Sequence, residues 1–139
     1  MSFPILKSMP STDVYQLNPK CRALAIALVK ECMKQGIKIK ITQTYRTNAY
    51  QVELRKKLGK VAALPGYSMH EFRDAFDVCI NDIADSYNIA KLTKVGLIGE
   101  KLGLTWGGRF DNVDRPHFQY TKPYTEKQII ASKGMKIPA

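Results

Sequence analysis

The sequence predicts one α+β domain in which helices pack on a small, mainly antiparallel sheet. The chain has 139 residues, a length typical of a single domain. Its 45% hydrophobic and 24% charged residues are typical of a globular protein and not of a disordered one. Helical and strand-like patterns alternate along most of the chain, and two strand candidates then follow each other around a glycine-rich turn.

The first half of the chain predicts two helices on either side of one strand. An Asn-Pro pair opens the segment 18–35 as a helix, and the glycine after it ends the helix. Isoleucines alternate with polar residues over 37–44, which is typical of a strand with one buried face. A basic helix is expected over 47–59, and the irregular stretch 60–69 after it contains a Pro-Gly turn.

The second half predicts a buried strand over 75–80, interrupted by one charge, and a helix over 88–102 with an apolar stripe. Two short strands are expected within 104–120. The remaining residues are lysine-rich and weakly patterned. We therefore expect a folded domain over 1–122, followed by a C-terminal extension or the start of a linker over 123–139.

The chain is strongly basic: 22 Lys and Arg stand against 12 Asp and Glu, which gives a formal net charge of +10. Such a charge favours an anionic partner. The basic cluster at 55–60 either is a solvated face or attracts anionic cell-wall polymers. No nucleic-acid motif accompanies it, and no apolar run approaches the ~18 residues of a membrane span, so we expect neither partner.

Two further features indicate the cellular setting. Residues 1–7 have neither the apolar core nor the cleavage site of a secretory signal, so we expect synthesis and folding in a cytosol. The cysteines, Cys21, Cys32 and Cys79, are odd in number and lie in helix or strand patterns. We expect them to be reduced, buried and without a role in function.

Asp77 is the charge inside the buried strand, and it needs a cation because burying an unpaired carboxylate costs on the order of several kcal/mol. One candidate partner is an arginine, either Arg46 or Arg73. The other is a metal ion shared with His70 and His117, the two histidines of the chain. Two imidazoles and one carboxylate with an open fourth position are typical of a catalytic zinc site.

Asp114 lies three residues before His117, in a turn that Pro116 keeps from becoming helical. Its carboxylate could act as a general base on a water molecule at such a site, with Glu71 as the next candidate for this role. The other interpretation is an aspartate that merely caps the turn.

Taken in order, these residues form a set of short motifs: Ser68-x-His70, Asp77, Trp106-Gly107-Gly108, Asp114 and Pro116-His117-Phe118. The set resembles the VanY-type D-alanyl-D-alanine carboxypeptidase family of LAS zinc peptidases. That family includes phage endolysins that are L-alanyl-D-glutamate endopeptidases. The resemblance covers about residues 37–120 and implies the hedgehog-like fold of this group with one zinc ion per chain.

The resemblance also implies a role for each matched residue. The implied zinc ligands are His70, Asp77 and His117. Asp114 matches the catalytic base, and Arg46 matches an arginine that stabilises the negative charge developing on the scissile carbonyl oxygen. Three further matches line or shape the substrate pocket: Ser68, Gln51 and Trp106.

Arg73 departs from the family pattern, which has a glycine at this position. If the backbone there has a positive φ, Arg73 carries strain that a glycine would avoid. The register up to Asp77 is kept, so we expect the ligands to stay in place. The Arg73 side chain either contacts substrate or points outward.

The resemblance implies a zinc peptidase that acts on the stem peptides of bacterial peptidoglycan. Without a signal at residues 1–7, we expect a monomeric phage endolysin that cuts the L-alanyl-D-glutamate bond. It would be made in the host cytoplasm and released to the wall through a holin. The alternatives are a D-alanyl-D-alanine carboxypeptidase or dipeptidase, and a catalytically silent zinc-binding, wall-binding module. The silent module would have no need of Asp114, and a basic nucleic-acid binder would have no need of the two histidines.

Overall fold

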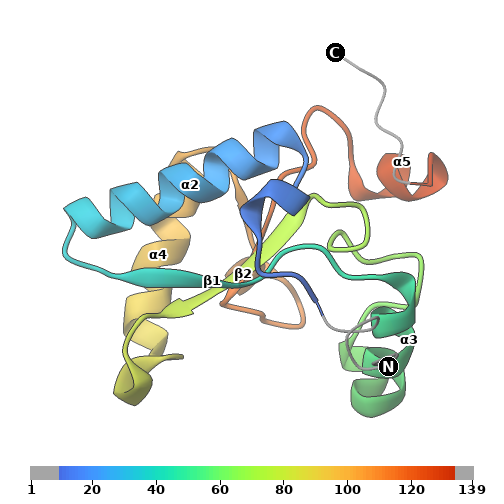
Figure 1. The fold of residues 1–139 in the computed structure, drawn as a ribbon, viewed down its shortest axis with the longest axis horizontal. Coiled ribbons are helices and arrows are strands. Elements are labelled where there is room, and N and C mark those ends of the chain that lie inside the picture. Colours follow the sequence, from blue (N-terminus) through green and yellow to red (C-terminus); the bar gives the residue numbers. More distant parts are fainter. Residues whose placement is uncertain (1–9, 134–139) are drawn as a thin grey trace, which may run out of the picture.

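The computed structural model describes residues 10–133. Within them, helices and strands alternate before two strands follow each other (Figure 1). Their bounds are α2 Pro19–Lys34, β1 Ile39–Gln43, α3 Asn48–Leu58, β2 Ala75–Ile80, α4 Ile89–Lys101, β3 Thr105–Trp106, β4 His117–Gln119 and α5 Glu126–Ala131. The predicted α+β class is therefore confirmed, and each predicted helix and strand is present within a few residues.

The four strands form one sheet in the order β1-β2-β4-β3, and all neighbours are antiparallel. Strand β2 is central, with Asp77 opposite Gln43 of β1 and opposite His117 of β4. The β1–β2 register shifts between Ile41 and Gln43. This register places polar residues of three strands side by side at one end of the sheet.

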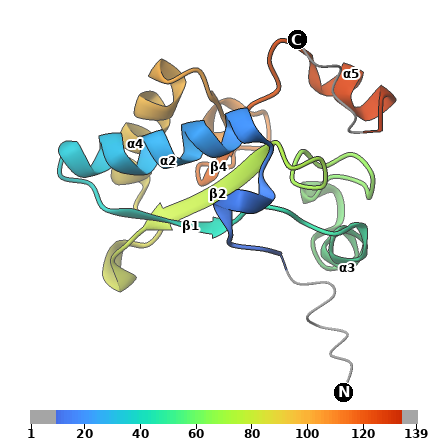
Figure 2. The same ribbon diagram turned by 45° about the horizontal axis from the view of Figure 1, so that its top comes forward.

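Helices α2 and α4 cover one face of the sheet, and α2 lies across α4 (Figure 2). The core lies between these helices and the strands, and a fully buried aliphatic or aromatic side chain there contributes roughly 1.5–3 kcal/mol. Its largest completely buried members include Leu17, Leu28, Phe76, Val78, Leu92, Val95 and Phe118. Helices α3 and α5 lie toward the other end of the molecule, next to the loops that carry the polar residues (Figures 1 and 2).

Two glycines let helix α4 approach the sheet closely. A Cβ atom on Gly96 would lie 2.1 Å from the Trp106 ring, and one on Gly99 would lie 2.6 Å from the Phe118 ring. Glycine inside a helix costs about 1 kcal/mol relative to alanine. Here that cost is offset because the two aromatic rings of β3 and β4 pack directly on the helix backbone.

The prediction that the three cysteines are buried is confirmed. All three are buried, and no disulfide joins them. Burial, followed by the charge of Glu31, raises the pKa of the Cys32 thiol to about 11. This thiol is therefore a poor nucleophile at neutral pH.

The residues just after 122 pack on the domain. Ile129 of α5 is 1% exposed and forms a small buried cluster with Met69 and Ala75. The division of the chain at residue 122 stays a prediction, but the helix beyond it is part of the folded unit. Residues 1–7, on which the prediction of cytosolic synthesis depends, and residues 134–139, the end of the predicted extension or linker, lie outside the described residues. None of the helices in 10–133 has the length and apolar content that a membrane crossing requires.

Candidate active site

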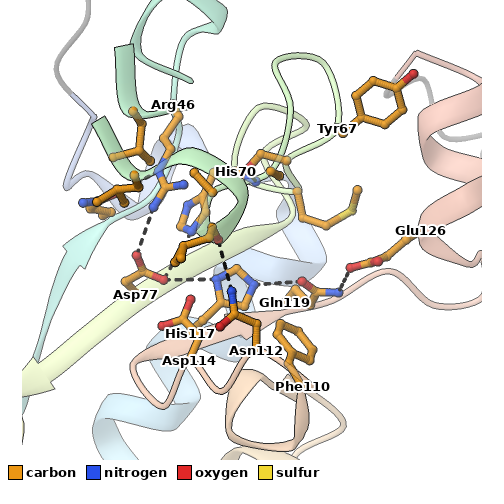
Figure 3. Close-up of a pocket in the computed structure, with 18 of the residues that line it drawn as sticks. Arg46, Tyr67, His70, Asp77, Phe110, Asn112, Asp114, His117, Gln119 and Glu126 are labelled. Carbon is orange, nitrogen blue, oxygen red and sulfur yellow. Dashed lines mark hydrogen bonds and ion pairs between the residues drawn. The ribbon is translucent and has the colours of Figure 1, made fainter. Parts of the chain in front are cut away.

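His70, Asp77 and His117 meet at the polar end of the sheet (Figure 3). Asp77 lies in β2, His117 begins β4 directly opposite it, and His70 lies in the loop before β2. One ligand atom from each residue lies within 4.8 Å of the others. Asp77 Oδ1 is 3.2 Å from His70 Nε2 and 3.1 Å from His117 Nδ1.

In each imidazole, the hydrogen bond of the nitrogen that faces away from Asp77 shows which nitrogen carries the proton. His70 Nδ1 is 2.7 Å from the carbonyl oxygen of Thr44, which can only accept, so Nδ1 carries the proton. His117 Nε2 is 2.8 Å from Gln119 Oε1 and donates to it. The lone pairs of His70 Nε2 and His117 Nδ1 therefore both face the Asp77 carboxylate.

Three electron-pair donors that converge in this way repel one another unless a cation lies between them. Two imidazole nitrogens and a carboxylate oxygen are the ligand set that zinc accepts, with a fourth position left for water or substrate. The hydrogen bonds on the far side of each ring are those that metal-binding histidines make to fix their orientation. The residues present therefore fit the predicted zinc ion.

The electrostatics agree with an ionised Asp77 among buried imidazoles. Burial lowers the pKa of His70. For His117, burial also acts to lower the pKa, but the adjacent Asp77 carboxylate raises it. Burial would raise the pKa of Asp77, yet the two histidines hold it well below its usual range. The site therefore favours a negative carboxylate that requires positive charge nearby.

Of the partners that the sequence left open for Asp77, Arg46 is in contact with it, and the two histidines that could share a metal ion with it are adjacent. Its Oδ1 faces the histidines, and its Oδ2 lies 3.4 Å from Arg46 Nη2. Arg46 Nε also donates to Gln43 Oε1 at 2.8 Å. The guanidinium is thus held at the edge of the cluster, where it lines the same pocket as the three candidate ligands.

Arg73 is not a partner of Asp77 and points away from the pocket. Its φ is 64°, the strained conformation predicted for a residue that replaces glycine. Its Nη1 donates to Gln16 Oε1 at 2.8 Å, and its guanidinium lies 3.9 Å from the centre of the Tyr45 ring. Of the two alternatives for Arg73, the outward orientation is therefore the one in the structure.

Ser68 lines the pocket as predicted, and its Oγ accepts a hydrogen bond from the backbone N–H of His70 at 3.2 Å. Gln51 requires a correction, because it is completely buried and does not line the pocket. Its amide instead donates to the Ala63 carbonyl at 2.8 Å and accepts from Arg46 at 3.4 Å. Gln51 therefore supports Arg46 from behind and is out of reach of a substrate.

Trp106 requires the same correction. It is 5% exposed, belongs to the core, and donates from its indole N–H to the Arg115 carbonyl at 2.8 Å. Cβ atoms on Gly96 or Gly108 would lie within 2.3 Å of its ring. Trp106 therefore does not line the pocket and shapes it only from beneath, by packing under the loop that carries Asp114 and His117.

Asp114 lies at the open side of the pocket, beside Asp77 and His117 (Figure 3). Its backbone N–H donates to the Gly107 carbonyl at 2.9 Å. A Cβ on Gly107 would lie 2.3 Å from the Asp114 carbonyl oxygen, so only glycine allows this approach. Partial desolvation raises the pKa of Asp114, although His117 opposes the shift. The Trp-Gly-Gly motif thereby places a carboxylate next to the candidate metal ligands.

Glu71, the other candidate base, has a structural position. Its carboxylate accepts from the backbone N–H groups of Gly66 at 2.9 Å and Ser68 at 3.2 Å, and from the Asn48 amide at 3.1 Å. It does not line the pocket. Glu71 therefore holds the loop before His70, and Asp114 is better placed to act on a water molecule.

The pocket is open and has a volume of about 520 Å³. One wall is apolar and comes mostly from α3 and the residues after it: Leu54, Leu58, Val61, Ala62 and Ala63. Other lining residues come from later in the chain: Phe110, Asn112, Val113, Gln119 and Glu126. Among the described residues that line the pocket, Arg46 is the only lysine or arginine.

Sequence reasoning missed three contributors to this site: the Thr44 carbonyl, Gln119 and Glu126. Gln119 could have been found, because residues two apart on a strand share a face and His117 lies two positions earlier. No local sequence pattern predicts that Glu126 contributes to the site, since its position depends on how α5 packs on the domain.

Comparison with known proteins shows a similarity to peptidases over part of the chain. Residues 62–120 match the sequence profile of a family described as D-alanyl-D-alanine carboxypeptidase. This segment contains His70, Asp77, Asp114 and His117. No curated protein matches the chain by sequence.

Several solved structures share the fold. The L-Ala D-Glu endopeptidase ChiX of Serratia marcescens has a TM-score of 0.65 at 16% identity, over 84% of this chain and 92% of that one. A mutant of the vancomycin resistance D,D-pentapeptidase VanY in complex with Zn(II) has a TM-score of 0.64 at 15% identity, over 83% and 78%. DacB from Streptococcus pneumoniae has a TM-score of 0.59 at 23% identity, over 91% and 78%.

The matched segment and the shared fold confirm the resemblance to the VanY-type zinc peptidase family that the sequence motifs predict.

Proposed function

We propose that this chain is a zinc-dependent metallopeptidase that acts on the stem peptides of peptidoglycan and hydrolyses the L-alanyl-D-glutamate bond. The observation that carries the proposal is the convergence of His70, Asp77 and His117 in an open pocket that also contains Asp114. The match to a peptidase profile over these residues supports it.

The roles proposed for the side chains follow from their positions. A zinc ion held by His70, Asp77 and His117 would lower the pKa of a water molecule toward neutrality and polarise the scissile carbonyl. Asp114 accepts a proton from the attacking water and delivers it to the leaving amine. Arg46, held by Gln43, offers its guanidinium to the carbonyl oxygen as negative charge develops there.

Two observations favour an endopeptidase. A structure named as an L-Ala D-Glu endopeptidase shares the fold over 92% of its own length. A carboxypeptidase must also hold the terminal carboxylate of its substrate, for which a cation is the usual partner. Arg46 is the one lysine or arginine among the described lining residues, and its guanidinium is already assigned to the scissile carbonyl oxygen.

The profile description favours a second candidate, a D-alanyl-D-alanine carboxypeptidase or dipeptidase. Mass spectrometry of purified peptidoglycan digested with the zinc-loaded protein distinguishes the two. The endopeptidase releases peptides that begin with D-glutamate, whereas the carboxypeptidase releases free D-alanine. Release of D-alanine alone would overturn the proposed bond. No product at all, from a protein that binds zinc, would indicate the silent zinc-binding module.

We further propose the endolysin setting, with synthesis in the host cytoplasm, a monomeric state and attraction to anionic wall polymers. The family resemblance and the net charge of +10 support it. Expression in a bacterial host with and without a holin tests the setting: lysis only with the holin is expected, and equal survival of both cultures contradicts it. Sedimentation with purified walls at increasing salt tests the attraction, which should weaken as salt rises.

A further inference from the structure

A chain of two hydrogen bonds connects His117 to helix α5. His117 Nε2 donates to Gln119 Oε1 at 2.8 Å, and the Gln119 amide nitrogen donates to Glu126 Oε1 (Figure 3). Gln119 is 4% exposed, so its amide is oriented by these two neighbours. Glu126 is the first residue of α5 and lies at the side of the pocket.

The carboxylate of Glu126 determines which group donates and which accepts in both hydrogen bonds. A glutamine amide can turn either its oxygen or its NH₂ group toward a neighbour, but an ionised carboxylate can only accept. Glu126 therefore selects the NH₂ group of Gln119. The amide oxygen is then left to face His117, which must place its proton on Nε2 and keep the lone pair of Nδ1 free.

We propose that Glu126 and Gln119 are positioning residues of the metal centre, which hold His117 in the tautomer that presents Nδ1 to the ion. This inference rests on the proposed zinc site. If Gln119 turned over, its NH₂ group would face Nε2 and favour a proton on Nδ1. A protonated Nδ1 cannot bind a metal ion, so a reversed amide would compete with zinc for His117.

The packing of α5 keeps Glu126 in place. Ile129 is buried against Met69 and Ala75, and Thr125 and Gln128 form a reciprocal capping box at the start of the helix. Glu126 lies in the first turn of this fixed helix. The segment after residue 122 therefore completes the site through one carboxylate.

The test is the zinc affinity of full-length variants, measured by competition with a chromophoric chelator. Glu126→Gln keeps size and shape but allows residue 126 to donate, so the Gln119 amide can reverse. We expect zinc to bind about 10- to 100-fold more weakly, the usual effect of losing such a supporting partner. Lys127→Ala, on the same helix and also exposed, is the matched control and should bind zinc like the wild type.

The exchanged pair Q119E/E126Q distinguishes positioning from a general structural role. Glutamate at 119 accepts from His117 Nε2–H with one oxygen and from the NH₂ group at 126 with the other. We expect the exchange to restore zinc affinity to within a few-fold of wild type, whereas Q119E alone places two carboxylates together and does not. In NMR spectra of the zinc-loaded proteins, which contain two histidines, the His117 Nε2–H proton should exchange with water faster in Glu126→Gln and slowly again in the exchanged pair.

Unchanged zinc affinity in folded Glu126→Gln, or failure of the exchanged pair to recover, would overturn the inference while leaving the zinc site intact. Absence of zinc binding by the wild-type protein would overturn both.

Discussion

Strands β2 and β4 have two faces that differ in how they depend on the rest of the chain. On one face Phe76 and Phe118 stack with ring centres 5.6 Å apart and pack beneath α2 and α4. On the other, Asp77, His117 and Gln119 contact one another and the loop that carries His70. Successive residues of each strand thus belong alternately to the core and to the site. Stability and chemistry can therefore be changed separately by substitutions one residue apart.

The largest expected effect is on the site face. Asp77→Asn replaces an anionic ligand with a neutral amide, which is a poor ligand for zinc. Metal content, activity and thermal stability should fall together, and activity on peptidoglycan should drop below detection. Metal analysis, a digestion assay and a melting curve check the three effects. An Asp77→Asn protein that keeps zinc would remove Asp77 from the ligand set.

The next effect separates a ligand from the proposed base. Asp114→Asn keeps the size of the side chain but removes its ability to accept a proton. Turnover should fall by roughly 10²–10⁴-fold, the usual contribution of a general base, while zinc content and melting temperature stay near wild type. Peptide release at a near wild-type rate would contradict the role of Asp114. Loss of zinc would make it a ligand instead.

On the core face, Phe118→Ala removes a ring that packs on Phe76 and on the backbone of Gly99. The cavity should lower the free energy of unfolding by about 3–5 kcal/mol. Because the change points away from the site, the fraction that remains folded should still bind zinc with wild-type affinity. Denaturant titration and zinc competition measure the two quantities. A parallel loss of affinity in the folded fraction would contradict the separation of the two faces.

The smallest effect is expected at Arg73, whose backbone strain and side-chain contacts oppose each other. Arg73→Gly relieves a positive φ, worth on the order of 1 kcal/mol or more, but loses the bond to Gln16 and the packing on Tyr45. We expect the free energy of unfolding to change by less than about 1 kcal/mol and the activity to stay the same. A clear loss of turnover would show that Arg73 acts on the substrate after all.

The two faces also differ in how well they could be predicted from sequence. Period-two and helical patterns identify the core strands and helices, and they place Phe76 and Phe118 on the apolar side without reference to distant residues. The candidate ligands were found because an aspartate inside an apolar strand requires a partner, and because the motifs resemble a known family. The pairing of Asp77 with His117, however, depends on a register between segments about forty residues apart along the chain.

The rest of the site depends on packing that no local pattern encodes. The resemblance implies that Gln51 and Trp106 line or shape the substrate pocket, but the first is buried behind Arg46 and the second lies between two glycines. Glu126 was assigned to an extension beyond the domain because its segment is lysine-rich and weakly patterned. Its position is fixed by one buried isoleucine, Ile129, whose contacts come from the loop before β2 and from β2 itself.

The most direct test of the central claim is the zinc content of the purified protein after dialysis without added metal, measured for the wild type and for His117→Ala. We expect about one zinc ion per wild-type chain and almost none in the variant, since a site with three protein ligands loses one of its two imidazoles. A wild-type protein without zinc, or a His117→Ala protein that retains a full equivalent, would contradict the proposed zinc site.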